Sequence, residues 1–277
     1  MASLRFFSPV TLFSLFFTLF FVFNLQAQNW KTQYDKTWSE DTTYTIVRKN
    51  NKSGLVETKT GNLVIPVKYT LIDRITDTVY RIADERYRGY ISPTGNWLVP
   101  MKYDLLWFEY PDRAIVEKNG MYGVVDFKGN VIIPVKYRQL DRASEQCFIA
   151  RVDSLCGVLD KNGKTLIPFK YEEMSMAERG TFPAKQGGKW GLIDWKDKVV
   201  IPFQWGYVYS FSDEMAMVSE VGKDGTNRCG FINRKNKLVI DYQYIMAYDF
   251  KNGRAEVLLD KKWVYIDKTG KVLGPSR

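Results

Sequence analysis

Carboxylates recur at regular intervals along this chain and are the first side chains to consider for chemistry. They stand once per copy of a repeat, directly before a polar turn: Asp126, Asp160, Asp194 and Asp267, with Glu57, Ser92 and Asn233 at the equivalent place. A glycosidase needs two carboxyl groups that converge in one pocket, roughly 5 to 10 Å apart, and nothing in the spacing singles out such a pair. A carboxylate before a turn accepts hydrogen bonds from the backbone two residues on, so we interpret these residues as turn formers.

The residues that most enzymes depend on are missing. The sequence contains no histidine, which removes the commonest general base, the commonest metal ligand and every Ser-His or Cys-His pair. No loop carries the alternating Asp and Asn ligands of a calcium motif. We therefore expect no enzymatic activity, no catalytic or metal-binding residues and no cofactor.

Two landmarks reveal an internal repeat. The first is a glycine, replaced by valine in the last copy: Gly54, Gly89, Gly123, Gly157, Gly191, Gly230 and Val264, with steps of 35, 34, 34, 34, 39 and 34 residues. The second is a proline, replaced by aspartate in the sixth copy: Pro66, Pro100, Pro134, Pro168, Pro202, Asp241 and Pro275. Two landmarks that keep one period predict seven tandem units of about 34 residues. The longer step places five extra residues within 220–228, as a lengthened hairpin tip.

Each copy predicts three short strands. In the third copy they are residues 113–117, residues 123–126 from the landmark glycine onward, and residues 131–134 ending at the proline. Short runs rich in Val, Ile, Tyr and Phe, bounded by Gly, Asn and Asp, are typical of strands, and none is long enough for a helix. Because proline cannot donate to a ladder, we expect it at a strand end or on an edge.

The turn between the second and third strands has its own signature. Only glycine, asparagine and aspartate occupy one position in it: Gly61, Gly95, Gly129, Gly163, Asp197, Asn236 and Gly270. These residues tolerate positive φ, so the position predicts a tight hairpin turn with a left-handed residue.

These residues carry a resemblance to a known family. The segment Lys189-Trp190-Gly191-Leu192-Ile193-Asp194, its turn, the Ile-Pro pair and an aromatic three residues later resemble the WG (KWG) repeat of bacterial proteins. The resemblance covers residues 44–275, although only Trp190-Gly191 is literally Trp-Gly. It implies a β-repeat array, often exported, of largely undefined biochemical role, and it supplies no catalytic residues.

The fold expected is all-β: tandem three-stranded meanders that form an extended β-solenoid or superhelical array. A seven-bladed β-propeller is the alternative. A unit of 34 residues is short beside the roughly 40 to 45 residues of a four-stranded blade, which favours the open array.

The chain divides into three parts. Residues 1–27 predict a signal peptide, since Arg5 precedes an apolar run from Val10 to Phe23 that is short for a membrane span; an uncleaved signal anchor is the alternative. Residues 28–43 carry Trp30 and Trp38 and predict an N-terminal cap, or else a linker. Residues 44–277 predict a single repeat domain. The mature protein is expected without an integral membrane span, in the periplasm, at the cell surface or outside the cell.

Three cysteines are an odd number for an exported chain. Cys147 and Cys156 stand on neighbouring strands of one expected hairpin, so a disulfide is open. Cys156 and Cys229 occupy the tryptophan position of the repeat, which indicates buried packing. We expect free, buried thiols.

Surface charge and aromatic residues supply the candidate binding residues. The formal charge is +9 at pH 7, and Lys68, Lys102, Lys136 and Lys170 each follow a landmark proline by two residues. Stacked units would align them into a basic row suited to an anionic polymer or an acidic protein, or simply to solvation. Trp97, Trp107, Trp195 and Trp205 are candidates to stack on sugar rings. Nucleic acid is not expected, because no binding motif is present.

The function expected is that of a non-catalytic, exported repeat protein. Its array would offer a binding or scaffold surface, with a protein at the cell envelope as the favoured partner. The alternative is a module that binds a glycan or another envelope polymer through exposed aromatics and the lysine row.

Overall fold

The computed structural model describes residues 30–39, 42–109, 111–176 and 179–276. The expected signal peptide, residues 1–27, lies outside these ranges. The chain falls into two compact units, each described by itself. Unit 1 comprises Met1–Asn119 and Val124–Val131, and unit 2 comprises Gly120–Gly123 and Ile132–Arg277. No helix within the described ranges is long and apolar enough to cross a membrane.

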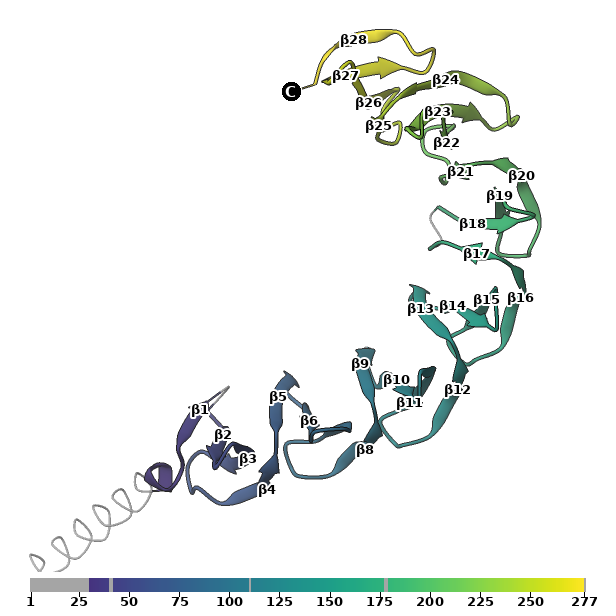
Figure 1. Cartoon of the computed structure of the whole chain (residues 1–277). Helices are drawn as coiled ribbons and strands as arrows, with labels where there is room; N and C mark the ends of the chain where they lie inside the picture. The colour runs from purple at the N-terminus through teal and green to yellow at the C-terminus, as the bar shows by residue number, and fades with distance from the viewer. Residues whose placement is uncertain (1–29, 40–41, 110, 177–178, 277) are drawn as a thin grey trace, which may run out of the picture. The chain divides into compact units, whose positions relative to one another are not determined.

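The described strands form seven four-stranded antiparallel sheets in tandem, each a meander (Figure 1). Sheet one holds β1 (Lys36–Ser39), β2 (Tyr44–Lys49), β3 (Lys52–Glu57) and β4 (Leu63–Tyr69). Sheet two holds β5 (Leu71–Thr76), β6 (Val79–Ala83), β7 (Arg88–Ile91) and β8 (Trp97–Tyr103). Sheet three, with residues of both units, holds β9 (Leu105–Glu109), β10 (Arg113–Lys118), β11 (Met121–Asp126) and β12 (Val131–Tyr137).

The remaining four sheets belong to unit 2. Sheet four holds β13 (Gln139–Ser144), β14 (Cys147–Val152), β15 (Leu155–Asp160) and β16 (Thr165–Tyr171). Sheet five holds β17 (Glu173–Met174), β18 (Thr181–Gln186), β19 (Lys189–Asp194) and β20 (Val199–Trp205). Sheet six holds β21 (Tyr207–Val208), β22 (Met215–Val221), β23 (Asn227–Asn233) and β24 (Leu238–Tyr244), and sheet seven holds β25 (Met246–Ala247), β26 (Arg254–Leu259), β27 (Lys262–Asp267) and β28 (Val272–Pro275).

The all-β tandem-repeat fold is confirmed, but the expectation of three strands per copy is wrong. Each sheet has a further strand, first in chain order. In sheet one it lies within the predicted cap or linker, and in the other sheets it lies within the predicted connections between copies. These first strands are edge strands, three of them only two residues long, and several carry polar residues, so they lack the alternation that marks a strand. A copy of 34 residues therefore holds a four-stranded sheet, and its length no longer counts against a propeller blade. The choice between an open array and a propeller stays a prediction.

The landmark proline lies inside the fourth strand, on the edge of its sheet. In sheet four, Cys156 pairs with Tyr171 and Val158 with Ile167, so β16 advances four residues while β15 advances two. Pro168 lies in the resulting bulge, where no ladder donor is needed. The prediction of an edge position is confirmed. The prediction that the strand ends at the proline is wrong in the first five sheets, whereas in sheet seven β28 does end at Pro275.

The landmark glycine faces this bulge. A Cβ built on Gly191 would lie 2.5 Å from the carbonyl oxygen of Ile201, and the same contact in the other glycine copies is 2.6 or 2.7 Å. Only glycine leaves room for the outer strand to pass this closely. In sheet seven Val264 takes the position, and there the short strand β28 pairs it directly with Pro275.

The predicted left-handed turn residue is confirmed in every copy. Its φ lies between 58° at Asn236 and 88° at Gly270. The lengthened hairpin tip is confirmed as well: Gly222 to Thr226 form the turn between β22 and β23, and Arg228 binds both carboxylate oxygens of Asp224.

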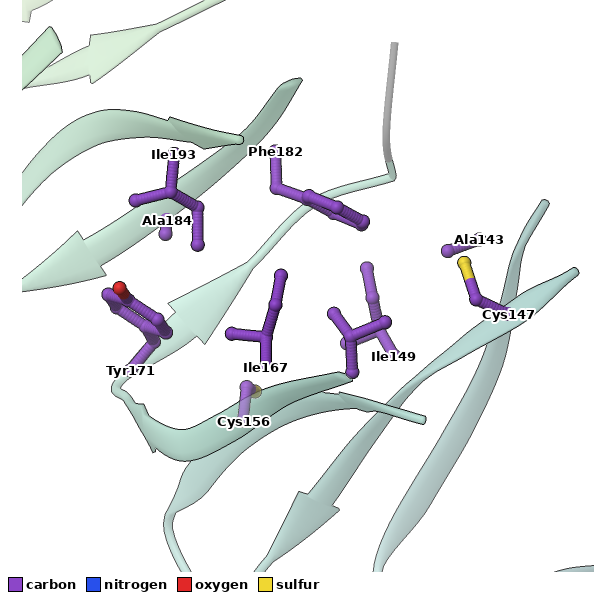
Figure 2. Close-up of a cluster of buried hydrophobic side chains, with 10 residues drawn as sticks. Ala143, Cys147, Ile149, Cys156, Ile167, Tyr171, Phe182, Ala184 and Ile193 are labelled. Atoms are coloured by element: carbon purple, nitrogen blue, oxygen red, sulfur yellow. The ribbon is translucent and has the colours of Figure 1, made fainter. Parts of the chain in front are cut away.

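The core lies between consecutive sheets. Figure 2 shows the cluster between sheets four and five, in which side chains from both sheets meet: Cys156, Ile167 and Tyr171 from one, Phe182, Ala184 and Ile193 from the other. The middle strands are therefore buried on both faces and read as continuous apolar runs, as in β14. Burying each large side chain contributes about 1.5 to 3 kcal/mol.

The segment before residue 44 contributes to sheet one. Its strand β1 pairs with β2, so residues 36–39 supply the first strand of the sheet. A short 3-10 helix, η1 (Trp30–Gln33), places Trp30 against Val47 and Val56, where it is buried. The division into a cap or linker and a repeat domain stays a prediction.

The three cysteines are free and buried. Cys147 pairs with Asp160, and Arg151 pairs with Cys156, so the two cysteines are not opposite each other in the hairpin. Burial raises the thiol pKa at Cys147, Cys156 and Cys229.

Candidate functional site

The recurring carboxylates form turns, as the sequence predicts. Asp194 Oδ1 accepts hydrogen bonds from the backbone N–H groups of Lys196 (2.8 Å) and Lys198 (2.9 Å). The hydrogen bonds from Lys198 and Lys196 lower the pKa of Asp194. Asn233 accepts the same two bonds in sheet six. These side chains are committed to the fold rather than to a site.

The four candidate lysines are exposed, and each lies over the ring of the following tyrosine. The distances from Nζ to the ring centroid are 5.3 Å for Lys68, 5.5 Å for Lys102, 5.6 Å for Lys136 and 5.2 Å for Lys170. Lys170 also binds Oδ2 of Asp197 at 2.5 Å. Lys68 and Lys102 belong to unit 1 and Lys136 and Lys170 to unit 2, and within each unit they occupy the same position of neighbouring sheets.

The four candidate tryptophans differ in burial and location. Trp97 (46% exposed) begins a fourth strand, Trp107 (45%) lies on a first strand, and Trp195 (38%) lies in a turn with its ring against Phe182. The expectation that Trp205 is exposed is wrong: it is 9% exposed, because it fills the aromatic position between sheets. Its Nε1 donates to Oδ1 of Asn236 over 3.0 Å.

A cavity in unit 2 has a volume of about 710 Å³, and we call it the hollow. It lies where residues of the connections that follow β17, β21 and β25 come together. Its lining includes Arg179, Tyr209, Met217, Tyr248, Asp249 and Phe250. The sizes of ligand pockets in proteins range from about 300 to 1,000 Å³, so the hollow can hold a small ligand or a short peptide segment.

Two half-exposed tyrosines line the hollow. Tyr209 is 38% exposed and packs edge-on against Tyr207, with ring centroids 4.7 Å apart. Tyr248 is 49% exposed and stacks on Trp263, with centroids 5.4 Å apart and the rings inclined by 27°. Burial raises the pKa of Tyr209, so its hydroxyl stays protonated at neutral pH. Both rings are held by a second ring, which pre-organises the surface.

Part of the polar lining of the hollow is engaged within the protein. Nη1 of Arg179 lies 2.8 Å from Oδ2 of Asp249. Oγ of Ser212 donates to the carbonyl oxygen of Phe250 over 2.7 Å. These contacts join the three connections that line the hollow.

A smaller cavity of about 360 Å³ adjoins the hollow, and we call it the side pocket. The two cavities share Tyr248, Asp249 and Lys251. Arg254 and Tyr265 also line the side pocket, and the guanidinium carbon of Arg254 lies 4.6 Å from the centroid of the Tyr265 ring.

The sequence reasoning missed this site. Its tyrosines lie in the connections, where no repeat landmark was recognised. One signal was available: Trp107, Tyr209 and Tyr248 each follow a landmark aromatic by four residues, which places them at the same point of successive copies. The position is aromatic only in some copies, so periodicity alone does not reveal it.

Chemically, the arrangement suits binding. Of its two carboxylates, Asp249 is paired with Arg179, and Glu256 accepts a hydrogen bond from Oγ of Ser276 at 2.7 Å. Across the described ranges, no three His, Cys, Asp or Glu residues are grouped as metal ligands.

Tandem four-stranded sheets joined by short connections, with clefts among the connections, define a β-repeat protein. The chain belongs to the family of the WG containing repeat, whose model matches residues 89–122, 122–156, 157–190, 190–223 and 230–263. The resemblance seen in the sequence is thereby confirmed. A comparison with curated proteins gave no match.

Several solved structures are similar to the chain at low sequence identity. A eukaryotic initiation factor is 10% identical, with 83% of this chain and 74% of that chain covered and a TM-score of 0.45. PorZ, a bacterial surface component of the type-IX secretion system of Porphyromonas gingivalis, is 9% identical over 88% of this chain and 40% of that chain, with a TM-score of 0.30. Hsv2 of Kluyveromyces lactis is 12% identical over 82% and 72%, with a TM-score of 0.36. With TM-scores this low, no function is taken from them.

Proposed function

We propose that this chain is a non-catalytic, exported repeat protein that binds a partner protein at the cell envelope through the hollow of unit 2. The observation that carries the proposal is a cavity of about 710 Å³ lined by two half-exposed tyrosines, in which Arg179, Asp249 and Ser212 already bind protein atoms. Export rests on the composition of residues 1–27, and places the protein in the periplasm, at the cell surface or outside the cell.

The lack of histidine and the commitment of the recurring aspartates to turns support a non-catalytic role. A general base must be free to take a proton from a bound substrate. Asp194 and its equivalents instead accept backbone hydrogen bonds within the turn between the third and fourth strands of a sheet.

Two observations favour a protein over a polysaccharide. A sugar-binding groove combines open aromatic faces with many free hydrogen-bonding groups, whereas Arg179, Asp249 and Ser212 of the hollow are engaged with protein atoms. None of the four candidate tryptophans lines the hollow or the side pocket. A polymer bound through the lysines and tryptophans is the other outcome of the test.

The test is a capture experiment with the full chain, expressed with its own leader and purified. The immobilised protein is incubated separately with soluble envelope proteins, peptidoglycan and lipopolysaccharide of its host. The Tyr209→Ser/Tyr248→Ser variant removes the exposed rings of the hollow. Val199→Ser is the matched control, because Val199 is exposed on the fourth-strand side of sheet five.

Retention of one defined protein in moderate salt, lost with the tyrosine variant and kept with the control, supports the proposal. Retention by a polysaccharide fraction that depends on the same tyrosines would replace it with glycan binding. Retention that neither variant changes would show that the hollow is not the binding site.

A further inference from the structure

The turn between β25 and β26 places two positive charges side by side. Lys251 and Arg254 form an antiparallel bridge across a two-residue turn, with backbone hydrogen bonds of 2.8 and 3.3 Å. Asn252 and Gly253, the two turn residues, have φ of 53° and 80°. Residues paired in this way have Cβ atoms about 5 Å apart, and like charges at such a pair destabilise a hairpin. Both side chains line the side pocket.

The nearby carboxylates offset this pair only in part. Asp249 is bound to Arg179, and Asp213 binds Lys268 and the backbone N–H of Gly253. Glu256 also lines the side pocket, and the Ser276 hydroxyl that it binds carries no charge, so its carboxylate offsets at most one of the two cations. Lys251 forms no ion pair with any residue in the described ranges. Arg254 has the Tyr265 ring beneath it, which orients the guanidinium without cancelling its charge.

The turn itself does not require cations. The corresponding bridge in sheet six joins Ser212 and Met215, with Asp213 and Glu214 as the turn residues of positive φ. The same backbone thus forms with uncharged side chains at both bridge positions. The cation pair of sheet seven is therefore a feature of its pocket rather than of its fold.

We infer that the hollow and the side pocket together bind an acidic peptide segment of the partner protein. A large apolar side chain of the peptide enters the hollow, among Tyr209, Met217 and Phe250. A carboxylate that follows it in the peptide lies in the side pocket between Lys251 and Arg254. The shared wall of Tyr248 and Lys251 makes the two contacts adjacent. This inference rests on the proposed function and names the chemistry of the partner.

An anionic polysaccharide satisfies only half of this arrangement. It could place a carboxylate between the two cations, but its rings carry hydroxyl groups that need hydrogen-bonding partners, and Arg179, Asp249 and Ser212 of the hollow are already engaged. A peptide supplies both the charge and the apolar side chain.

The experiment measures binding of three synthetic octapeptides, labelled with an uncharged dye, to the purified protein by fluorescence anisotropy. The first contains two leucines followed by three glutamates; the second and third replace the glutamates by glutamines or lysines. An oligogalacturonate is added as an unlabelled competitor. The inference predicts that the glutamate peptide binds at least about tenfold more tightly than the glutamine peptide, and that the lysine peptide does not bind.

The matched variants are Lys251→Gln/Arg254→Gln, which removes the charges, and Lys223→Gln, which removes an exposed lysine of the turn between β22 and β23. We expect the double variant to lose about tenfold or more in affinity for the glutamate peptide, and the control to keep it. Thermal unfolding provides the second readout. The double variant is expected to unfold at the same or a higher temperature, since a repulsion is removed, whereas a purely structural pair would lower the unfolding temperature.

Equal binding of the glutamate and glutamine peptides, unchanged affinity in the double variant, or no binding of the glutamate peptide at about 1 mM would overturn the inference. Displacement of the peptide by oligogalacturonate at equal concentration would also overturn the inference, and would indicate an anionic glycan as the ligand. The proposed function has a separate test, because a captured protein that depends on Tyr209 and Tyr248 would support it even if the peptide were not acidic.

Discussion

Arg179 and Asp249 form an ion pair of 2.8 Å between residues 70 apart in the chain, and the pair ties the connection of sheet five to that of sheet seven. Both side chains are partly exposed, and such pairs contribute at most about 1 kcal/mol to stability. The pair instead affects the net charge where the hollow meets the side pocket, because Asp249 lines both cavities.

Breaking this pair from either side is predicted to change peptide affinity in opposite directions. Asp249→Ala frees the guanidinium and removes a negative charge beside Lys251, so the glutamate peptide should bind up to about fivefold more tightly. Arg179→Ala leaves the Asp249 carboxylate uncompensated and should weaken binding by a similar factor. Anisotropy titrations of both variants check this, and a change in the same direction in both would contradict the charge assignment.

The landmark glycine is predicted to be far less replaceable than an exposed turn glycine. Gly191→Ala places a Cβ 2.5 Å from the carbonyl oxygen of Ile201, so the outer strand must move, at a cost of about 1 to 3 kcal/mol or more. Gly225→Ala meets no atom within 4 Å and carries only the cost of its φ of 76°, about 1 kcal/mol. Denaturant unfolding of the two variants measures the difference. Equal losses would mean that the bulge is not held closely against the glycine.

The turn aspartates predict a loss of stability in acid. Hydrogen bonds from the Lys198 and Lys196 backbones lower the pKa of Asp194 below its ordinary value of 3.8. The side-chain hydrogen bond from Thr269 likewise lowers the pKa of Asp267. A carboxyl group whose pKa falls on folding stabilises the protein above its unfolded pKa. That contribution is lost as the pH drops through the lowered folded value, so stability should fall below about pH 4.

Asp194→Asn separates the charge from the turn geometry. Asn233 makes the same two backbone hydrogen bonds in sheet six, so the asparagine should keep the turn. We expect any advantage of the native aspartate in unfolding temperature at pH 7 to shrink as the pH falls below 3.8. A difference that stays constant from pH 7 to pH 3 would contradict the role of the ionised carboxylate.

The cysteines predict a simple thiol assay. All three are free and buried, and burial raises their pKa values, so a water-soluble disulfide reagent should react slowly with the native protein. After denaturation without reductant, all 3 thiols should titrate. Recovery of only one would reveal a disulfide between two of them.

The features that the sequence predicts correctly are those that local sterics impose. The left-handed position admits only glycine, asparagine and aspartate, so Asp197 and Asn236 could be aligned with the glycines of other copies. The landmark glycine repeats because the bulge allows no side chain. The second and third strands are recognisable because both faces are buried between sheets.

The first strands and the candidate site could not be predicted in the same way. A first strand such as β25 is only two residues long and is held by tertiary pairing with β26 rather than by its own pattern. The hollow forms from three connections that come together only when the sheets stack, and its key residues, Tyr209 and Tyr248, are not constrained by the repeat. Trp205 was misplaced because its landmark position is buried by the next sheet, where Asn236 receives its hydrogen bond.

Site-specific photo-crosslinking in the native host tests the central claim most directly. A benzophenone amino acid is introduced at position 209, 248 or 199, and the adducts are identified by mass spectrometry. The account predicts that positions 209 and 248, in the hollow, form adducts with one and the same protein, at an acidic segment with a large apolar side chain. Position 199, on the fourth-strand side of sheet five, should not. Equal adducts from position 199, or none from 209 and 248, would contradict it.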